Sequence, residues 1–180
     1  ADSSNVFKVP VSELAAAADT LGRTAGASSI SILDLQQSMA AGGLVAKGAG
    51  LSIEEFSTAI GIMGDQGLKA SDAGTSLKSF IAGLTPSSVE AKAAMRNLGI
   101  EVFDAQGNFK AFPEILKSLS AGFSGLTEEQ RATTAELLFG SDGVRAFSAL
   151  VPAAAVGLQD AAGQWAAFNA KAAETPGVAE

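Results

Sequence analysis

Short blocks of helical periodicity, each opened by a capping residue and closed by Gly or Pro, constrain the fold of this chain more than any other feature. Apolar residues recur at three- and four-residue spacings over roughly 10 to 18 residues at a time, which is the period of an amphipathic helix. The 180 residues include 20 Gly and 5 Pro, so each block ends soon after it begins. This pattern predicts a compact all-α domain of about seven or eight short helices.

The capping residues give the expected starts of these helices. Ser31 precedes one block, Ser52 and Glu55 have the spacing of a capping box, and similar boxes begin at Ser87 and Thr127. The sequence divides into a helical domain over residues 1–155 and a C-terminal helix with a linker over residues 156–180. The expected helices lie at residues 12–23, 32–47, 53–65, 71–84, 87–98, 114–120, 127–139, 142–150 and 156–173.

A single stretch departs from the helical period. Residues 100–103 alternate between apolar and polar side chains, and Asp104 to Gly107 has the composition of a turn. The sequence therefore predicts one small two-stranded β-hairpin, from Ile100 to Lys110, in an otherwise all-α fold.

Three glycines are expected to have positive φ angles. Gly67 and Gly99 follow predicted helices, and Gly107 lies in the predicted turn. We expect these positions to tolerate substitution less well than Gly61 or Gly157, where no such conformation is required.

Other glycines predict close contacts between helices. Gly74 lies inside a helix, where Gly costs about 1 kcal/mol relative to Ala, and the pair Gly42-Gly43 falls in the helix expected at 32–47. Gly74 predicts close packing against a neighbour, whereas the Gly42-Gly43 pair predicts either a bend in its helix or the close approach of another backbone. The expected core residues are Ile60, Met63, Leu77, Phe80, Ile81, Leu84, Leu98, Phe103, Leu116, Leu138 and Phe139.

Missing residue types exclude several kinds of active site. The chain has no His and no Cys, which excludes zinc sites built on imidazole or thiolate, His-based triads and cysteine nucleophiles. The paired carboxylates Glu54-Glu55 and Glu128-Glu129 fall in first helical turns, where negative charge complements the helix dipole. No phosphate-binding glycine motif is present. We therefore expect no enzyme activity, no cofactor and no metal site.

The charges argue against two kinds of partner. With 12 basic and 19 acidic residues the net charge is −7, and the basic residues form no run, so we expect no nucleic-acid binding by this segment. Its most apolar stretch, residues 144–158, is interrupted by Arg145 and Pro152 and is shorter than the roughly 20 residues of a membrane span. Trp165 and Phe168 share one side of the last helix. They are either exposed anchors for a partner or rings buried by a helix that folds back.

Short motifs follow one another in a specific order along the chain. A helix at 50–63 and a turn-helix at 67–78 precede a segment at 98–108 and the later Phe-Gly pair; the residues that define the last three are Gly67, Ser71, Gly74, Gly99, Asp104, Gly107, Phe139 and Gly140. This ordered set resembles the core region of tail tape measure proteins of long-tailed bacteriophages and prophages, over roughly residues 15–150.

The resemblance implies a structural protein that sets tail length, supports tail tube assembly and takes part in DNA ejection. It implies the tail tube protein, tail assembly chaperones and distal tail or baseplate proteins as partners. Self-association is a separate expectation that the resemblance does not supply. It also implies a location in the lumen of the virion tail tube, and in the host cytoplasm during assembly. The alternatives are a module associated with a peptidoglycan hydrolase and another protein-interaction module of a tail protein.

Overall fold

The computed structural model describes residue 7, residues 10–151 and residues 161–177. These residues form one short 3₁₀-helix and eight α-helices, and they contain no β-sheet, which confirms the all-α class. The elements are η1 (Val11–Glu13), α2 (Leu14–Ala27), α3 (Ile32–Gly48), α4 (Ile53–Asp65), α5 (Ala70–Gly83), α6 (Val89–Asn97), α7 (Phe112–Phe123), α8 (Glu128–Leu150) and α9 (Ala161–Glu174).

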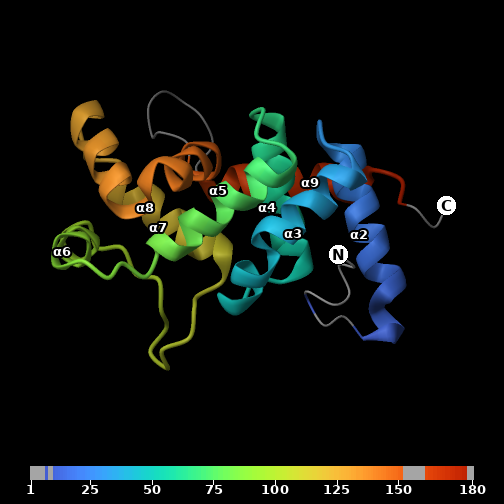
Figure 1. Ribbon diagram of the computed structural model, residues 1–180, viewed down its shortest axis with the longest axis horizontal. Helices are drawn as coiled ribbons and strands as arrows, with labels where there is room; N and C mark the ends of the chain where they lie inside the picture. The colour runs from blue at the N-terminus through green and yellow to red at the C-terminus, as the bar shows by residue number, and fades with distance from the viewer. Residues whose placement is uncertain (1–6, 8–9, 152–160, 178–180) are drawn as a thin grey trace.

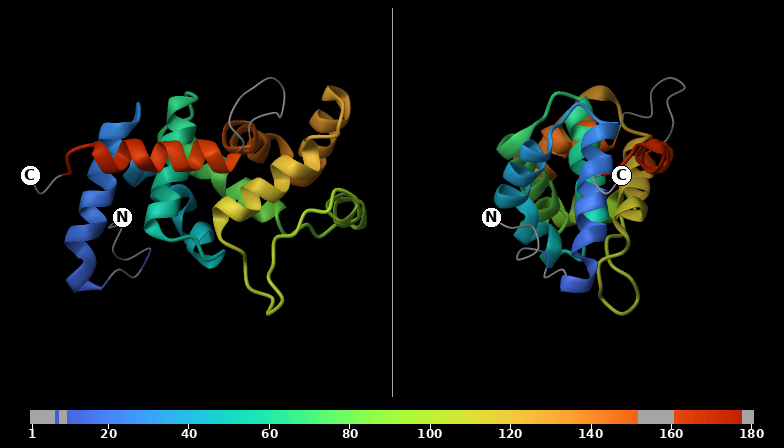
Figure 2. Two further views of the ribbon diagram at one scale, coloured as in Figure 1. Left: turned by 180° about the vertical axis from the view of Figure 1, so that it is seen from behind. Right: turned by 90° about the vertical axis from the view of Figure 1, so that its right-hand side faces the viewer.

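The helices form an elongated bundle. Figure 1 shows α2 at one end, α3, α4 and α5 in the middle, and α6 with α8 at the other end. Helix α9 runs along the back of the bundle, where it crosses α2 and α4 (Figure 2) and also contacts α7. Helices near the two ends of the sequence, α2 and α9, are therefore packed together. The predicted boundary between a helical domain over residues 1–155 and a C-terminal segment over residues 156–180 stays a prediction.

Most helices begin where the capping pattern predicts. Ser31, Ser52 and Thr127 each accept a hydrogen bond from the backbone N–H three residues later, and each N3 side chain binds back to the cap. The α6 start differs by one residue from the prediction, because the Ala91 N–H donates to Ser88 (3.1 Å). These bonds satisfy N–H groups that would otherwise lack a partner at the helix ends.

Helices α3 and α5 approach so closely that there is no space for side chains at their crossing. A Cβ atom on Gly42 would overlap the carbonyl of Gly74, and a Cβ atom on Gly74 would overlap the backbone of Ser38. The predicted close approach at Gly42 and Gly74 is therefore confirmed. The hydroxyl of the fully buried Ser38 also donates to the carbonyl of Ala70 at 2.6 Å, which ties the start of α5 to the middle of α3.

The start of α5 departs from the prediction of a cap near Ser71. Lys69 occupies the N-cap position without a side-chain cap bond, and Ala70 has a φ of 54°. Positive φ is uncommon for a residue with a side chain. This conformation accompanies the hydrogen bond between the Ala70 carbonyl and Ser38 described above, an interaction between distant residues that local sequence could not reveal.

Helix α8 packs on the other end of α5 through a second pair of small residues. A Cβ atom on Gly83 would overlap the Leu138 carbonyl, and one on Gly143 would lie 3.0 Å from the Phe80 nitrogen. Gly140 has φ 63° and ψ 173° and breaks α8 into two parts, as the separate helices expected at 127–139 and 142–150 require. The break lets both parts of α8 lie against α5.

The predicted β-hairpin is wrong. Among the described residues, the segment from Ile100 to Lys110 has only an isolated antiparallel bridge between Phe103 and Phe109. The Lys110 N–H donates to the Val102 carbonyl and the Asp104 N–H donates to the Asn108 carbonyl, both at 2.9 Å, but these two bonds form only the single bridge and no strand. The segment is thus a loop between α6 and α7, and it extends away from the helices (Figure 1).

The core prediction holds with two exceptions. All the expected core residues are buried except Leu98, which is half-buried, and Phe103, whose surface is 43% exposed. Phe103 contacts Phe109 in the loop, with the two rings tilted and their centroids 4.7 Å apart. Without a second strand or a covering layer, alternation alone does not bury a side chain.

The aromatic pair on α9 lies inside the bundle, which is one of the two arrangements expected for it. Trp165 and Phe168 are 6% and 7% exposed, and Trp165 meets Phe112 edge-on with ring centroids 5.6 Å apart. The Phe168 ring occupies the space beside Gly61 on α4. Gly61 is therefore not a tolerant position, contrary to expectation, and Gly157 lies outside the described residues.

Replacing Gly74 by Ala should destabilise the fold. The added methyl group meets the backbone of α3, and overpacking of this kind costs about 1–3 kcal/mol. Urea denaturation followed by circular dichroism measures the effect. Gly48→Ala, at a position with open space beside it, is the matched control and should leave the free energy of unfolding unchanged or raise it by up to about 1 kcal/mol. Equal stability of the two variants would contradict the assigned crossing.

Replacing Phe168 by Ala should loosen α9. The variant leaves a cavity beside Gly61, and Phe→Ala substitutions in a core cost about 3–5 kcal/mol. Trp165 is the sole Trp of the chain, so its emission should shift to the red at lower urea concentrations than in the parent protein. Lys171→Ala, on the exposed side of α9, should leave the emission and the transition unchanged.

Candidate functional site

The described residues contain no cluster that resembles a metal centre. No three Asp or Glu side chains in this part of the chain lie close enough together to hold an ion. Over the same residues, no helix has both the length and the apolar character needed to cross a membrane.

In the carboxylate pair on α4, Glu55 has a structural role. Glu55 accepts the backbone N–H of Ser52 at 3.0 Å through one oxygen, and that of Phe112 at 3.3 Å through the other. The same side chain thus caps α4 and holds the first residue of α7 beside it. The other pair, Glu128 and Glu129, lies exposed in the first turn of α8.

Two of the motif glycines end helices. Gly67 has a φ of 87° after α4, and the Leu68 N–H donates to the Met63 carbonyl at 2.9 Å, as in a Schellman motif. Gly99 ends α6 in the same way, with a φ of 64°. The positive φ angles predicted at both glycines are confirmed.

Asp104 and Gly107 shape the tip of the loop between α6 and α7. One carboxylate oxygen of Asp104 accepts the N–H groups of Gln106 and Asn108, both at 2.9 Å, and Gly107 has the predicted positive φ, at 83°. The backbone hydrogen bond from Asn108 is the largest of the effects that lower the pKa of the Asp104 carboxyl below its usual 3.8. Nearby, Lys110 binds Glu101 at 2.8 Å and lowers the pKa of that carboxyl, first through the hydrogen bond and then through its charge.

The remaining motif residues lie along α5 and α8. Gly74 forms the crossing with α3, and Gly140 breaks α8. Phe139 contacts Phe80 with the rings tilted and their centroids 4.8 Å apart, and Ser71 is exposed in the first turn of α5. The motif residues do not converge on one cavity, and any direct role in binding stays a prediction.

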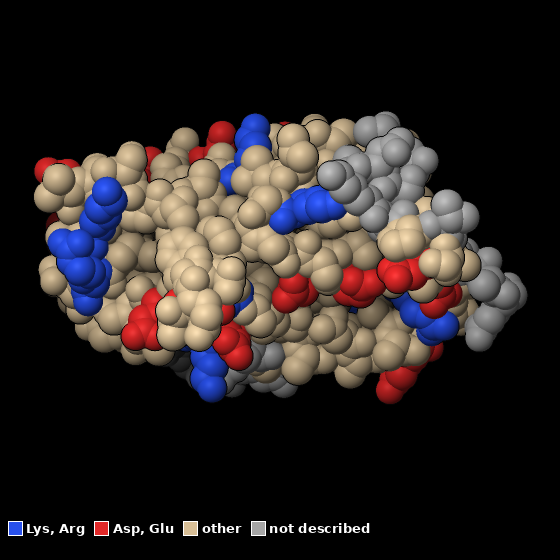
Figure 3. Space-filling model, turned by 90° about the horizontal axis from the view of Figure 1, so that it is seen from below, with Lys and Arg blue, Asp and Glu red and all other residues tan. Residues whose placement is uncertain are grey.

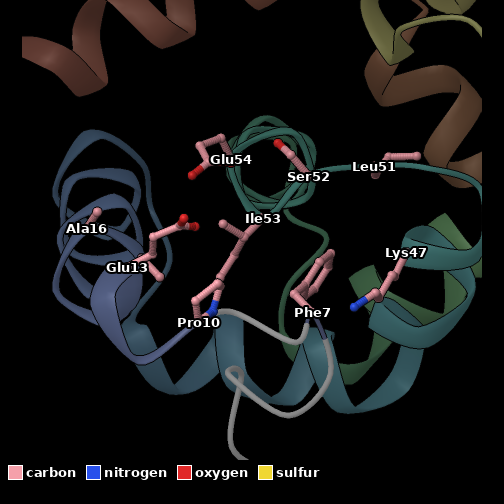
Figure 4. A pocket seen from close by; sticks show the side chains of 10 residues that line it. Phe7, Pro10, Glu13, Ala16, Lys47, Leu51, Ser52, Ile53 and Glu54 are labelled. Atoms are coloured by element: carbon pink, nitrogen blue, oxygen red, sulfur yellow. The ribbon is translucent and has the colours of Figure 1, made fainter.

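One surface hollow lies between η1, α2, α3 and α4. It has a volume of about 410 Å³. Figure 4 shows Glu13 and Glu54 near one another on one side of the hollow, and Phe7 and Lys47 on the other side. Two carboxylates and one amine around a small apolar surface give this hollow a mixed, mostly acidic character.

A second hollow, the α6 hollow, opens between α6 and the loop that follows it. Its volume is about 460 Å³, and its apolar lining comes from Leu84, Pro86, Met95, Ile100, Val102 and Phe103. Lys92 and Arg96 complete it from one face of α6. In the view from below (Figure 3), basic side chains gather at the end of the molecule that α6 forms.

Sequence reasoning missed the α6 hollow. The available signal was the four-residue spacing of Lys92 and Arg96, which places both on one helix face, next to a Met at position 95. The hollow itself depends on the position of the loop, which was expected to bury Phe103 in a hairpin.

Comparison with known proteins identifies relatives in phage tails. A family model described as phage-related minor tail protein matches residues 1–140. The tape measure protein of Pneumococcus phage Dp-1 is 31% identical over 153 residues, which are 85% of this chain and 13% of that protein. The probable tape measure protein of Escherichia phage P2 is 28% identical over 158 residues, which are 87% of this chain and 19% of that protein.

The chain spans less than a fifth of the length of these curated relatives. No solved structure matches it.

The loop tip should respond to pH through Asp104. Its folded-state pKa lies below 3.8, so the turn is stabilised above about pH 4 and loses that stabilisation as the pH falls through the lowered pKa. In proton–nitrogen NMR spectra, the amide signals of Gln106 and Asn108 should therefore shift with a midpoint below 3.8. Asp104→Asn should abolish this titration and Glu101→Gln should preserve it. A midpoint at or above 3.8 would contradict the assigned hydrogen bonds.

Proposed function

The chain belongs to the phage-related minor tail protein family, and on that premise we propose that it is the folded core module of a tail tape measure protein from a phage or prophage. Two relatives that carry this name each align with more than four-fifths of the chain. The ordered motifs of the sequence support the same assignment. The proposed role is structural and not enzymatic, within the virion tail.

The parent protein is proposed to lie in the lumen of the tail tube, after assembly in the host cytoplasm. There it sets tail length, supports assembly of the tube and takes part in DNA ejection. Its proposed partners are the tail tube protein, the tail assembly chaperones and distal tail or baseplate proteins. Self-association through this module is a further part of the proposal.

One structural observation supports a role for this module other than setting tail length. Its longest helix has 23 residues and is broken at Gly140, and the helices pack back on one another in a bundle. A single helix lengthens by about 1.5 Å per residue. A bundle of the same number of residues is much shorter, because its helices lie side by side. We therefore propose that this module acts as a folded unit, for recognition or assembly, and that other parts of the parent protein supply the length.

A point substitution in the phage genome tests this function without changing the number of residues. Gly74→Val forces a branched side chain into the α3–α5 crossing and should abolish tail assembly or infectivity. Gly48→Val, at a position with no atom near the added Cβ, should leave infectivity unchanged. Plaque assays and electron microscopy of tails are the measurements, and Gly74→Val particles with full infectivity would contradict a role for the folded module.

A deletion separates the folded unit from a simple ruler. Removing residues 12–150 in frame should either block tail assembly or leave completed tails of nearly normal length that are not infectious. Infectious particles whose tails are shorter by roughly 200 Å, at about 1.5 Å per helical residue, would show that the segment is part of the ruler. Cleavage of peptidoglycan by the purified chain would overturn the structural role in favour of a hydrolase.

A further inference from the structure

We propose that the α6 hollow binds a helical protein segment whose apolar side chains are flanked by Asp and Glu. The inference deepens the proposed function. It rests on that function only for the source of the segment, which would be another tail protein. The binding chemistry comes from the hollow alone.

The apolar lining of the hollow is already assembled in the folded chain. Leu84, Met95, Ile100 and Val102 are at most 7% exposed, and they come from the end of α5, from α6 and from the following loop. Phe103 forms a more accessible wall, at 43% exposed. A partner can therefore insert apolar side chains against a fixed floor and cover an aromatic ring that water now contacts.

The hollow is large enough to hold more than one side chain of a partner. Its volume of about 460 Å³ falls within the range of about 300–1,000 Å³ typical of ligand pockets, and it opens at the surface between two elements. A helix that presents apolar residues at three- and four-residue spacings can place neighbouring side chains in such a space. This shape favours a helical segment over a single inserted residue.

The charges beside the hollow favour an acidic partner. Lys92 and Arg96 are both exposed, and within the described part of the chain neither makes an ion pair. The nearby loop carboxylates are already engaged, because Glu101 binds Lys110 and Asp104 binds the turn amides. Two unpaired cations thus stand beside an apolar floor, in a chain whose net charge is −7.

The hollow near Phe7 and a nucleic-acid ligand fit this chemistry less well. The hollow near Phe7 carries Glu13 and Glu54, which repel an acidic segment. Nucleic acid requires several phosphate contacts to overcome the net negative charge of the chain, and α6 offers two cations. A helix with carboxylates around an apolar stripe matches both the floor and the rim of the α6 hollow.

A designed peptide tests the proposal on the purified full chain. The probe is a fluorescein-labelled, amidated peptide of about five helical turns, with Leu at three- and four-residue spacings and Glu or Asp between them. Two control peptides keep this pattern: one replaces every acidic residue by Lys, and the other replaces every Leu by Ala. Fluorescence anisotropy should show binding of the acidic probe alone, and its affinity should fall as NaCl is raised from about 50 to about 500 mM.

Matched variants locate the binding surface. The double variant Lys92→Glu/Arg96→Glu should weaken binding of the acidic probe by about tenfold or more. Lys78→Glu/Lys171→Glu makes the same charge change at exposed positions outside the hollow. The affinity of this control variant for the acidic probe should stay within about twofold of that of the parent protein when both are measured at the same NaCl concentration. For the apolar part, Phe103→Ser should weaken binding by about fivefold, whereas Val89→Ser, exposed on α6 but outside the lining, should not.

Several outcomes would overturn the proposal. These are no binding of the acidic probe, equal binding of the Lys or Ala control peptide, equal loss in both double variants, or tighter binding of single-stranded DNA. Concentration-dependent self-association that requires Lys92 and Arg96, measured by analytical ultracentrifugation, would assign the hollow to a second copy instead. The peptide assay uses no phage particles, so its failure leaves the Gly74→Val test of the proposed function intact.

Discussion

The close approach of α5 to α3 on one side and to α8 on the other is the constraint on which the rest of the bundle depends. Gly74 and Gly83 leave no space for a side chain at these two crossings. Glycine inside a helix costs about 1 kcal/mol relative to Ala, and dense packing around the crossings offsets that cost. Phe80, between the two glycines, contacts Phe112 of α7 and Phe139 of α8. Helix α5 therefore sets the positions of three other helices.

Local sequence predicts the features of this fold that depend on one helical turn. The caps at Ser31, Ser52 and Thr127 each involve residues three positions apart, and Gly67 and Gly99 end helices through bonds within the same few residues. Such interactions need only the right residue types at a fixed spacing. The class of the fold and most of its core follow from them, because the helix ends and the apolar faces together limit how the helices can pack.

The features that sequence reasoning missed depend on residues far apart in the chain. Gly61 was expected to tolerate a side chain, because its neighbour in space, Phe168, lies more than a hundred positions away in the sequence. Phe103 looked buried because alternation indicates the two sides of a strand, but does not indicate whether a second strand pairs with it. The α6 hollow is missed for the same reason. Its floor combines residues from α5, α6 and the following loop, and the sequence predicted a β-hairpin where this loop lies.

The residues that carry the family resemblance mostly build the fold. Gly67, Gly99 and Gly140 set backbone angles, Gly74 permits a helix crossing, and Phe139 fills the core. The basic side chains of the α6 hollow, Lys92 and Arg96, lie outside the motif segments. A related chain can therefore keep this scaffold and present a different surface beside α6. The resemblance accordingly says more about the shape of the module than about its partner, and the partner has to be identified from the chemistry of the exposed surface.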